Sequence, residues 1–90
     1  MSELNDIQWQ ILDSVYFVES FEHILEEVDA KAAIVADELK TMIARGWIQV
    51  MDFDGERGDF VKTIFYDSDN MHAYRYLATR QGLMKHNGYS

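Results

Sequence analysis

Acidic side chains at alternating positions are the first residues of this sequence whose types and spacing could do chemistry. Asp52, Asp54 and Glu56 have the spacing of the opening ligands of a calcium-binding loop, which also needs glycine at its sixth position and a bidentate glutamate at its twelfth. Those two positions hold Arg57 and Thr63. The pattern therefore indicates a solvated turn rather than a calcium site.

Other groups with catalytic or metal-binding potential lack partners at the required spacing. Glu22 and Glu26 lie one helical turn apart, but no base or nucleophile accompanies them as acid–base catalysis requires. The histidines are too far apart in sequence for a paired helical zinc site; they are His23, His72 and His86. The chain has no cysteine, and no glycine stretch opens a helix as a phosphate-binding loop does. We expect no catalytic residues, no metal and no cofactor, and therefore no enzyme.

The charge of the chain is uneven along its length. The formal net charge is −8; residues 1–30 hold eight acidic residues and no lysine or arginine, whereas residues 61–90 hold two acidic and four basic residues. Because phosphate binding depends on basic side chains, the N-terminal third is expected to repel nucleic acid. Its charge complements that of the C-terminal third, which favours contact between the two, within one chain or between copies.

The length and composition are typical of one folded domain, which we predict over residues 1–90. Ninety residues are fewer than two domains usually need, and 48% hydrophobic residues are ample for a packed interior. No apolar run is long enough to span a membrane, and the N-terminus lacks the order of a signal peptide. Since the lack of cysteine also fits a reducing compartment, we expect a cytoplasmic location.

Three helices are predicted in the first half of the chain. Apolar residues recur at helical spacing over residues 5–18, and again over 21–28 after Ser20, a side chain that can cap a helix. The same spacing predicts a third helix over 30–45. Gly46 directly follows a basic last turn, which is typical of a helix end.

The periodicity changes in the second half. β-Branched and aromatic residues flank the polar, glycine-bearing segment 54–59, which predicts a β-hairpin over residues 47–66. A closing helix is predicted over about 70–86, because apolar residues return to helical spacing there. Whether this helix is continuous or breaks near Thr79 is left open, since Thr79 can cap a new helix and Gly82 weakens a continuous one.

The resulting order of three helices, a hairpin and a closing helix resembles that of the winged-helix superfamily. The segment VADELKTMIARGWI at residues 35–48 is similar to a recognition helix that continues through a glycine turn into the first wing strand. The segment YLATRQGL at residues 76–83 is similar to one that many such regulators place after the wing. The resemblance implies an α+β fold with a two-stranded wing. It also implies that the third helix presents these residues to a DNA major groove: Ala33, Ala36, Asp37, Lys40 and Thr41.

The sequence departs from the superfamily's DNA-binding pattern at both expected surfaces. The outward positions of the third helix are mostly small or acidic, and only Lys40 suits contact with a base or a phosphate. In the wing, four acidic residues surround the single base Arg57. A basic patch in the C-terminal third is an open alternative for nucleic acid: Lys62, Arg75, Arg80 and Lys85.

A protein-interaction or dimerisation module is the first function that these observations favour. The chain has more large aromatic residues than a core of this size is expected to cover, and clustered exposed aromatics mark interfaces. Winged-helix proteins commonly pair through the first and closing helices, so the resemblance implies a homodimer. The candidate interface residues are Trp9, Asp13, Tyr16, Tyr74 and Arg75.

A small dimeric DNA-binding transcriptional regulator is the alternative. It rests on the resemblance of fold alone, which is a weak guide to function. Its candidate nucleic-acid contacts are Lys40, Thr41, Arg57 and Lys62.

Overall fold

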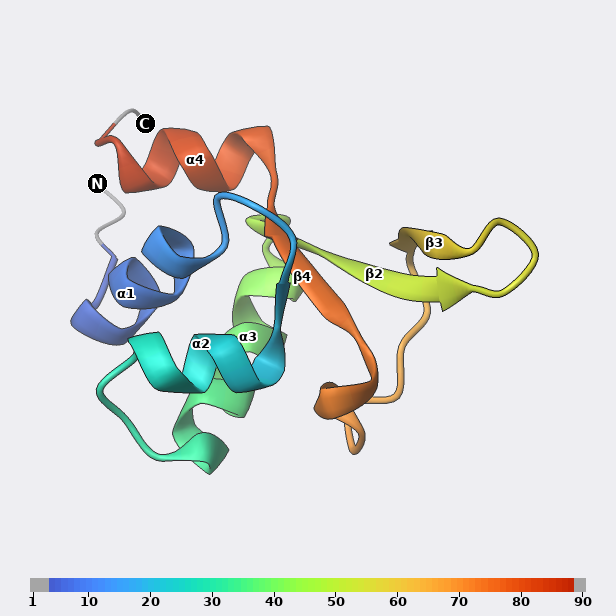
Figure 1. The fold of residues 1–90 in the computed structure, drawn as a ribbon. Coiled ribbons are helices and arrows are strands. Elements are labelled where there is room, and N and C mark those ends of the chain that lie inside the picture. The colour runs from blue at the N-terminus through green and yellow to red at the C-terminus, as the bar shows by residue number, and fades with distance from the viewer. Residues whose placement is uncertain (1–3, 89–90) are drawn as a thin grey trace.

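Helices dominate the first half of the computed structural model, and strands dominate the second; the structure describes residues 4–88 (Figure 1). The helices of this part are α1 (Asp6–Ser14), α2 (Phe21–Glu27), α3 (Ala32–Ala44) and α4 (Arg80–His86). The strands are β1 (Glu19–Ser20), β2 (Ile48–Asp54), β3 (Asp59–Thr63) and β4 (Arg75–Ala78), and the 3-10 turn η1 (Met71–Ala73) precedes β4. The α+β class is therefore confirmed.

Polar side chains fix where the first two helices begin. Asn5 Oδ1 accepts a hydrogen bond from the amide of Gln8 at 2.7 Å, and Gln8 Oε1 accepts one from the amide of Asn5 at 3.1 Å. This reciprocal capping satisfies two amides that the helix leaves unpaired. Ser20 Oγ accepts from the amide of His23 at 3.1 Å, which confirms the predicted cap of α2.

The turn from α3 into β2 depends on a glycine. Gly46 has φ of +79°, a left-handed conformation that side chains disfavour and that commonly ends helices. The amide of Trp47 then donates to the carbonyl of Met42 at 2.9 Å. The predicted end of the third helix at this glycine is confirmed.

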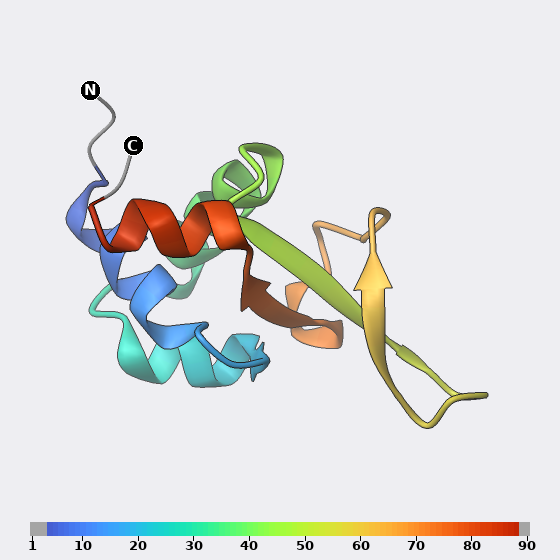
Figure 2. The same cartoon turned by 90° about the horizontal axis from the view of Figure 1, so that it is seen from above.

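The strands form one antiparallel sheet in the order β1–β4–β2–β3. β2 pairs with β4 along its first half, where Ile48 lies opposite Ala78. It pairs with β3 along its second half, where Val50 lies opposite Thr63 and Asp54 opposite Asp59. Because β4 reaches only the first half of β2, the tip of the β2–β3 hairpin projects away from the helices (Figures 1 and 2).

The closing helix predicted over residues 70–86 is wrong. Its first part consists of η1 and β4, and only the seven residues of α4 are helical after that. Within β4, burial alternates along Arg75–Ala78, as it does in a strand with one face toward a core. The first half of β2 needs a partner for its main-chain groups, and that long-range pairing outweighs the local helical spacing.

Two further boundaries differ from the prediction. The hairpin is part of a four-stranded sheet rather than a separate two-stranded wing. The first helix ends at Ser14, so residues 16–18 lie outside it and are exposed. The carbonyl of Val15 instead accepts a hydrogen bond from the amide of Ala78 at 2.9 Å, which ties the chain leaving α1 to β4.

The core lies between the helices and the inner face of the sheet. Tyr76 is fully buried there, and its hydroxyl donates to the carbonyl of Met71 at 2.7 Å. Burial raises the pKa of the Tyr76 phenol, because the charged form loses its solvation. The other fully buried large side chains are Ile11, Leu12, Val15, Ile24, Val35, Leu39, Met42 and Val50. Over residues 4–88, no helix combines the length and the apolar character that crossing a membrane requires.

Candidate interaction site

Three of the five predicted interface residues meet at one side chain, His86 at the end of α4. The ring of Trp9 on α1 stacks on the His86 ring with centroids 4.5 Å apart, and the Tyr16 ring meets it edge-on at 5.2 Å. The Tyr16 hydroxyl lies 2.6 Å from His86 Nδ1, and Asp13 Oδ1 lies 3.5 Å from His86 Nε2. Residues 70 positions apart in sequence are thus joined across the α1–α4 contact. We call these four residues the His86 cluster.

The imidazole is the buried centre of the His86 cluster. The His86 side chain is 8% exposed, and Nε2 is the one buried side-chain nitrogen or oxygen without a hydrogen-bond partner within residues 4–88. A carboxylate facing Nε2 favours a proton on that nitrogen, which leaves Nδ1 to accept from the Tyr16 hydroxyl in the neutral ring. The ring therefore orients both aromatic neighbours.

The aromatic members of the His86 cluster reach solvent. Trp9 is 47% exposed and Tyr16 is 40% exposed. Phe17, the next residue in the chain, is 79% exposed, and Met84 on α4 is also exposed. Aromatic residues and methionine are enriched at the centres of protein interfaces. We call Trp9, Tyr16, Phe17 and Met84 the aromatic surface.

The structure places the other two predicted interface residues elsewhere. Tyr74 is 9% exposed, and its hydroxyl accepts a hydrogen bond from the amide of Asp67 at 2.7 Å. Arg75 lies on β4, where its guanidinium sits over the Phe60 ring at 4.7 Å. These residues support the sheet and the η1 segment rather than the aromatic surface.

His86 was not among the predicted site residues. Its partners on α1 are known only once α4 packs against α1, and no local pattern encodes that pairing. A weak signal was available in the sequence, because a histidine in the last turn of a helix is favoured there by the helix dipole.

Local acidic side chains pair with two of the four candidate nucleic-acid contacts, Lys40 and Arg57. Lys40 Nζ lies 3.3 Å from Asp37 Oδ1, and the Thr41 hydroxyl donates to the carbonyl of Asp37 at 3.2 Å. Arg57 Nε, at the hairpin tip, lies 3.6 Å from Asp54 Oδ2. The four residues are not brought together: Lys40 and Thr41 are on α3, Arg57 is in the turn, and Lys62 is exposed on β3.

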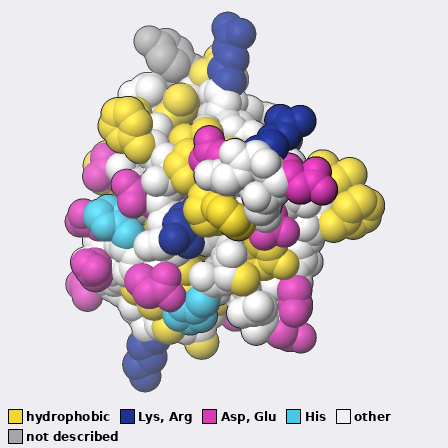
Figure 3. Space-filling model, turned by 45° about the vertical axis from the view of Figure 1, so that its right-hand side comes forward, with side chains coloured by type: hydrophobic (Ala, Val, Ile, Leu, Met, Phe, Trp, Pro, Cys, Tyr) yellow, Lys and Arg dark blue, Asp and Glu magenta, His cyan; other side chains and the backbone are white. Residues whose placement is uncertain are grey.

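Charges on the hairpin side of the molecule do not form a basic face. Acidic side chains are spread over this view, and the lysine and arginine side chains are scattered among them (Figure 3). In the segment whose acidic spacing resembles a calcium-binding loop, Asp54 Oδ1 accepts hydrogen bonds from the amides of Glu56 and Arg57, at 3.0 and 3.4 Å. Its carboxylate therefore shapes the turn. Over residues 4–88, no three acidic or histidine side chains gather in a way that could hold a metal ion.

Comparison with known proteins yields no matching family model, no matching curated protein and no matching solved structure. Function must therefore be argued from the geometry of this chain.

Proposed function

We propose that the chain is a non-catalytic winged-helix domain that acts as a protein-interaction module and forms a homodimer through the aromatic surface. The order α1–β1–α2–α3–β2–β3, with a glycine turn between α3 and β2, supports the winged-helix assignment. The proposal includes a role in regulation, which the fold permits but does not by itself determine.

The observation that carries the proposal is the His86 cluster. Large aromatic side chains that are held rigidly and still half-exposed lose little conformational freedom on binding, which makes them effective anchors. Trp9 and Tyr16 are both fixed by contacts with the buried His86 ring. Their exposure is greater than a purely structural role requires.

A second copy is the partner that the surrounding charge favours. Asp6 and Asp13 are exposed on α1. Arg80 and Lys85 lie on α4, the helix that packs against α1 in the same chain. A two-fold axis through the aromatic surface would place α1 of one copy against α4 of the other. Acidic side chains would then face basic ones, which steers association and selects the partner.

Sedimentation equilibrium over a concentration series tests the proposal. We expect the wild-type protein to self-associate, and Trp9→Ala to raise the dissociation constant by about tenfold or more, as removal of an aromatic anchor does. The matched control is Phe53→Ala, because Phe53 is an exposed aromatic on the hairpin. A wild-type protein that stays monomeric throughout the series would overturn the homodimer, and equal effects of the two variants would overturn the assigned surface.

A DNA-binding regulator remains a second candidate because of one observation. Ala33, Asp37 and Thr41 on α3 are exposed, as the contact face of a recognition helix would be. The ion pair between Lys40 and Asp37 counts against strong phosphate binding.

A further inference from the structure

β3 forms an open edge of the sheet. It pairs with β2 on one side only, because the strand order is β1–β4–β2–β3. The carbonyl of Asp54 accepts a hydrogen bond from the amide of Gly58 at 2.8 Å, so Asp54 directs its main-chain groups toward the β3 side. These directions alternate along paired strands. Val61 therefore bonds to β2, whereas Phe60 and Lys62 direct their N–H and C=O groups to the free edge.

An aspartate of the same strand bonds to one of these edge groups. Asp59 Oδ1 accepts a hydrogen bond from the amide of Phe60 at 2.8 Å, where the carbonyl of an added strand would otherwise bond. The chain contains no proline with which to block the edge, and Lys62 is the cation that β3 places there. The edge is therefore open to pairing, and Asp59 competes for one of its amides.

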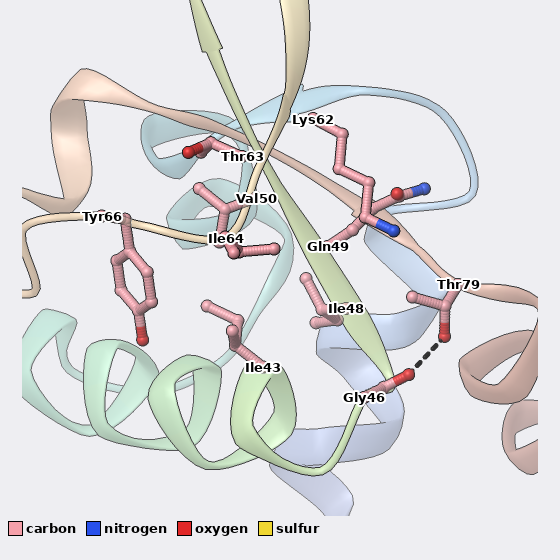
Figure 4. Close-up of a pocket in the computed structure, with 10 residues that line it drawn as sticks. All are labelled: Ile43, Gly46, Ile48, Gln49, Val50, Lys62, Thr63, Ile64, Tyr66 and Thr79. Carbon is pink, nitrogen blue, oxygen red and sulfur yellow. Dashed lines mark hydrogen bonds between the residues drawn. The ribbon is translucent and has the colours of Figure 1, made fainter.

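The shape of the hairpin leaves room for a second copy. Side chains alternate along β3, where Lys62 and Thr63 point to opposite sides (Figure 4). The strand ends at Thr63, whose hydroxyl donates to the carbonyl of Phe65 at 2.9 Å, beside a pocket of about 330 Å³ (Figure 4). The hairpin tip projects away from the helices (Figure 2). An antiparallel copy would lay its own tip against the base of this hairpin, so the helices of the two copies would lie at opposite ends and would not collide.

We propose that a second copy of this chain adds its own β3 to the free edge, antiparallel and in the register that places Val61 opposite Val61, so that one sheet continues through both copies. Edge-directed residues must meet edge-directed residues for their main-chain groups to bond. In this register Phe60 of each copy exchanges main-chain hydrogen bonds with Lys62 of the other. All five residues of β3 are then paired.

The side chains of β3 select this register and a second copy as the occupant. The register about Lys62 would set two lysines directly opposite each other, which is destabilising. The register about Phe60 would pair only Asp59 to Val61 within the strands. The register about Val61 instead sets Lys62 opposite an aromatic ring and Asp59 opposite Thr63, and it joins two β-branched valines, a favourable cross-strand pair.

This contact goes beyond the homodimer proposed above, because it uses the hairpin and not the aromatic surface of α1 and α4. Both contacts are two-fold and they lie on different parts of the chain. Together they would join dimers into larger assemblies.

A dilution series of the ¹⁵N-labelled full chain tests the main-chain contact. We expect the amide signals of Phe60 and Lys62 to shift with protein concentration. Lys62→Pro removes an amide that points away from β2, so it should abolish the shift of Phe60 while the β2–β3 ladder persists. Lys62→Ala is the matched control, because it keeps that amide and should keep the shift. Asp59→Ala should strengthen the association, since its carboxylate no longer competes for the Phe60 amide.

A pair of charge variants tests the register. Val61→Lys and Val61→Glu each set like charges opposite each other across the two-fold axis, and a mixture of the two variants sets opposite charges there. We expect the mixture to associate about fivefold more tightly than either variant alone. Only the register about Val61 gives this result.

Three results would overturn the inference. The first is a Phe60 signal in the wild-type chain that does not depend on concentration. The second is equal behaviour of Lys62→Pro and Lys62→Ala, because the edge amide would then play no part. The third is a mixture of the Val61 variants that associates no more tightly than each alone. The signals of Trp9 and Tyr16 report association through α1 and α4 in the same spectra, so the two proposals fail separately.

Discussion

Gly82 on α4 faces the carbonyl group of Trp47 so closely that a Cβ on residue 82 would lie 2.0 Å from the carbonyl oxygen. The same carbonyl accepts a hydrogen bond from the amide of Thr79, whose hydroxyl donates to the carbonyl of Gly46 at 2.6 Å and accepts from the amide of Gly82 at 3.0 Å. The first turn of α4 is thus fastened to the α3–β2 turn. One helical turn further on, His86 reaches Trp9 and Tyr16.

Gly82→Ala should therefore destabilise the protein strongly. Alanine favours a helix over glycine by about 1 kcal/mol, but here α4 must move off the Trp47 carbonyl. Because a main-chain carbonyl cannot rotate away as a side chain can, we expect a cost near the upper end of the usual range for overpacking, about 3 kcal/mol. Urea unfolding measures the net loss. Gly55→Ala is the matched control, because nothing lies within 4 Å of a Cβ at that position. It should change the free energy of unfolding by less than about 0.5 kcal/mol, and equal effects of both substitutions would contradict the close contact.

The segment 70–86 explains why part of the fold was not predictable. Tyr74, Leu77 and Ala78 fit helical spacing, yet the strand β4 forms there because β2 offers it a pairing edge. That edge comes from residues nearly thirty positions earlier, and no local propensity reports it. The capping role of Thr79 was readable, because a threonine before a polar turn carries its own hydrogen-bonding chemistry.

The candidate site, like the fold, was predictable only in part from the sequence. Trp9, Asp13 and Tyr16 were predicted from the sequence, because the chain has more large aromatic residues than its core is expected to cover and the resemblance implies pairing through the first helix. That Tyr16 follows the end of α1 and turns back to His86 depends on the packing of α4. Tyr74 was predicted on the same surface because a helix was expected to carry it, whereas it lies between η1 and β4.

Tyr16→Phe tests whether the His86 cluster is preorganised. The substitution keeps the ring and removes the hydroxyl that lies 2.6 Å from Nδ1. We expect a loss of about 1 kcal/mol in the free energy of unfolding, as for a typical hydrogen bond, and a shift of the His86 ring signals in ¹H–¹⁵N spectra. An unchanged His86 spectrum would mean that the hydroxyl does not bond to the ring in solution.

Glu22 and His72 form a contact between α2 and η1 whose contribution depends on pH. The hydrogen bond from His72 holds the pKa of Glu22 below its ordinary value of 4.5, and the positive charge of Arg75 adds to the effect. A lowered pKa in the folded state stabilises the protein above the unfolded pKa, and this stabilisation is lost as the pH falls through the folded pKa.

Glu22→Gln should therefore be less stable than the wild type at pH 6, and the difference should shrink as the pH falls below about 4.5. Thermal unfolding between pH 6 and pH 3 measures both curves. Glu26→Gln provides the control, because Glu26 is exposed on the same helix and forms no ion pair with the part of the chain that the structure describes. A constant difference across the pH range would show that the His72 contact is not formed.

Mixed-sequence duplex DNA separates the two candidate functions. Because Lys40 and Arg57 each lie beside an acid and the total charge is −8, we expect little binding in a fluorescence-anisotropy titration, even at low salt. Should α3 and the hairpin bind phosphate nonetheless, Lys40→Ala and Arg57→Ala would each weaken affinity and reduce its dependence on salt. Trp9→Ala would then leave DNA affinity unchanged at concentrations where the protein is monomeric. Tight, salt-sensitive DNA binding would therefore favour the regulator over the interaction module if Lys40→Ala and Arg57→Ala both weaken it. An acidic recognition surface cannot bind DNA in this way without the positive charges of Lys40 and Arg57.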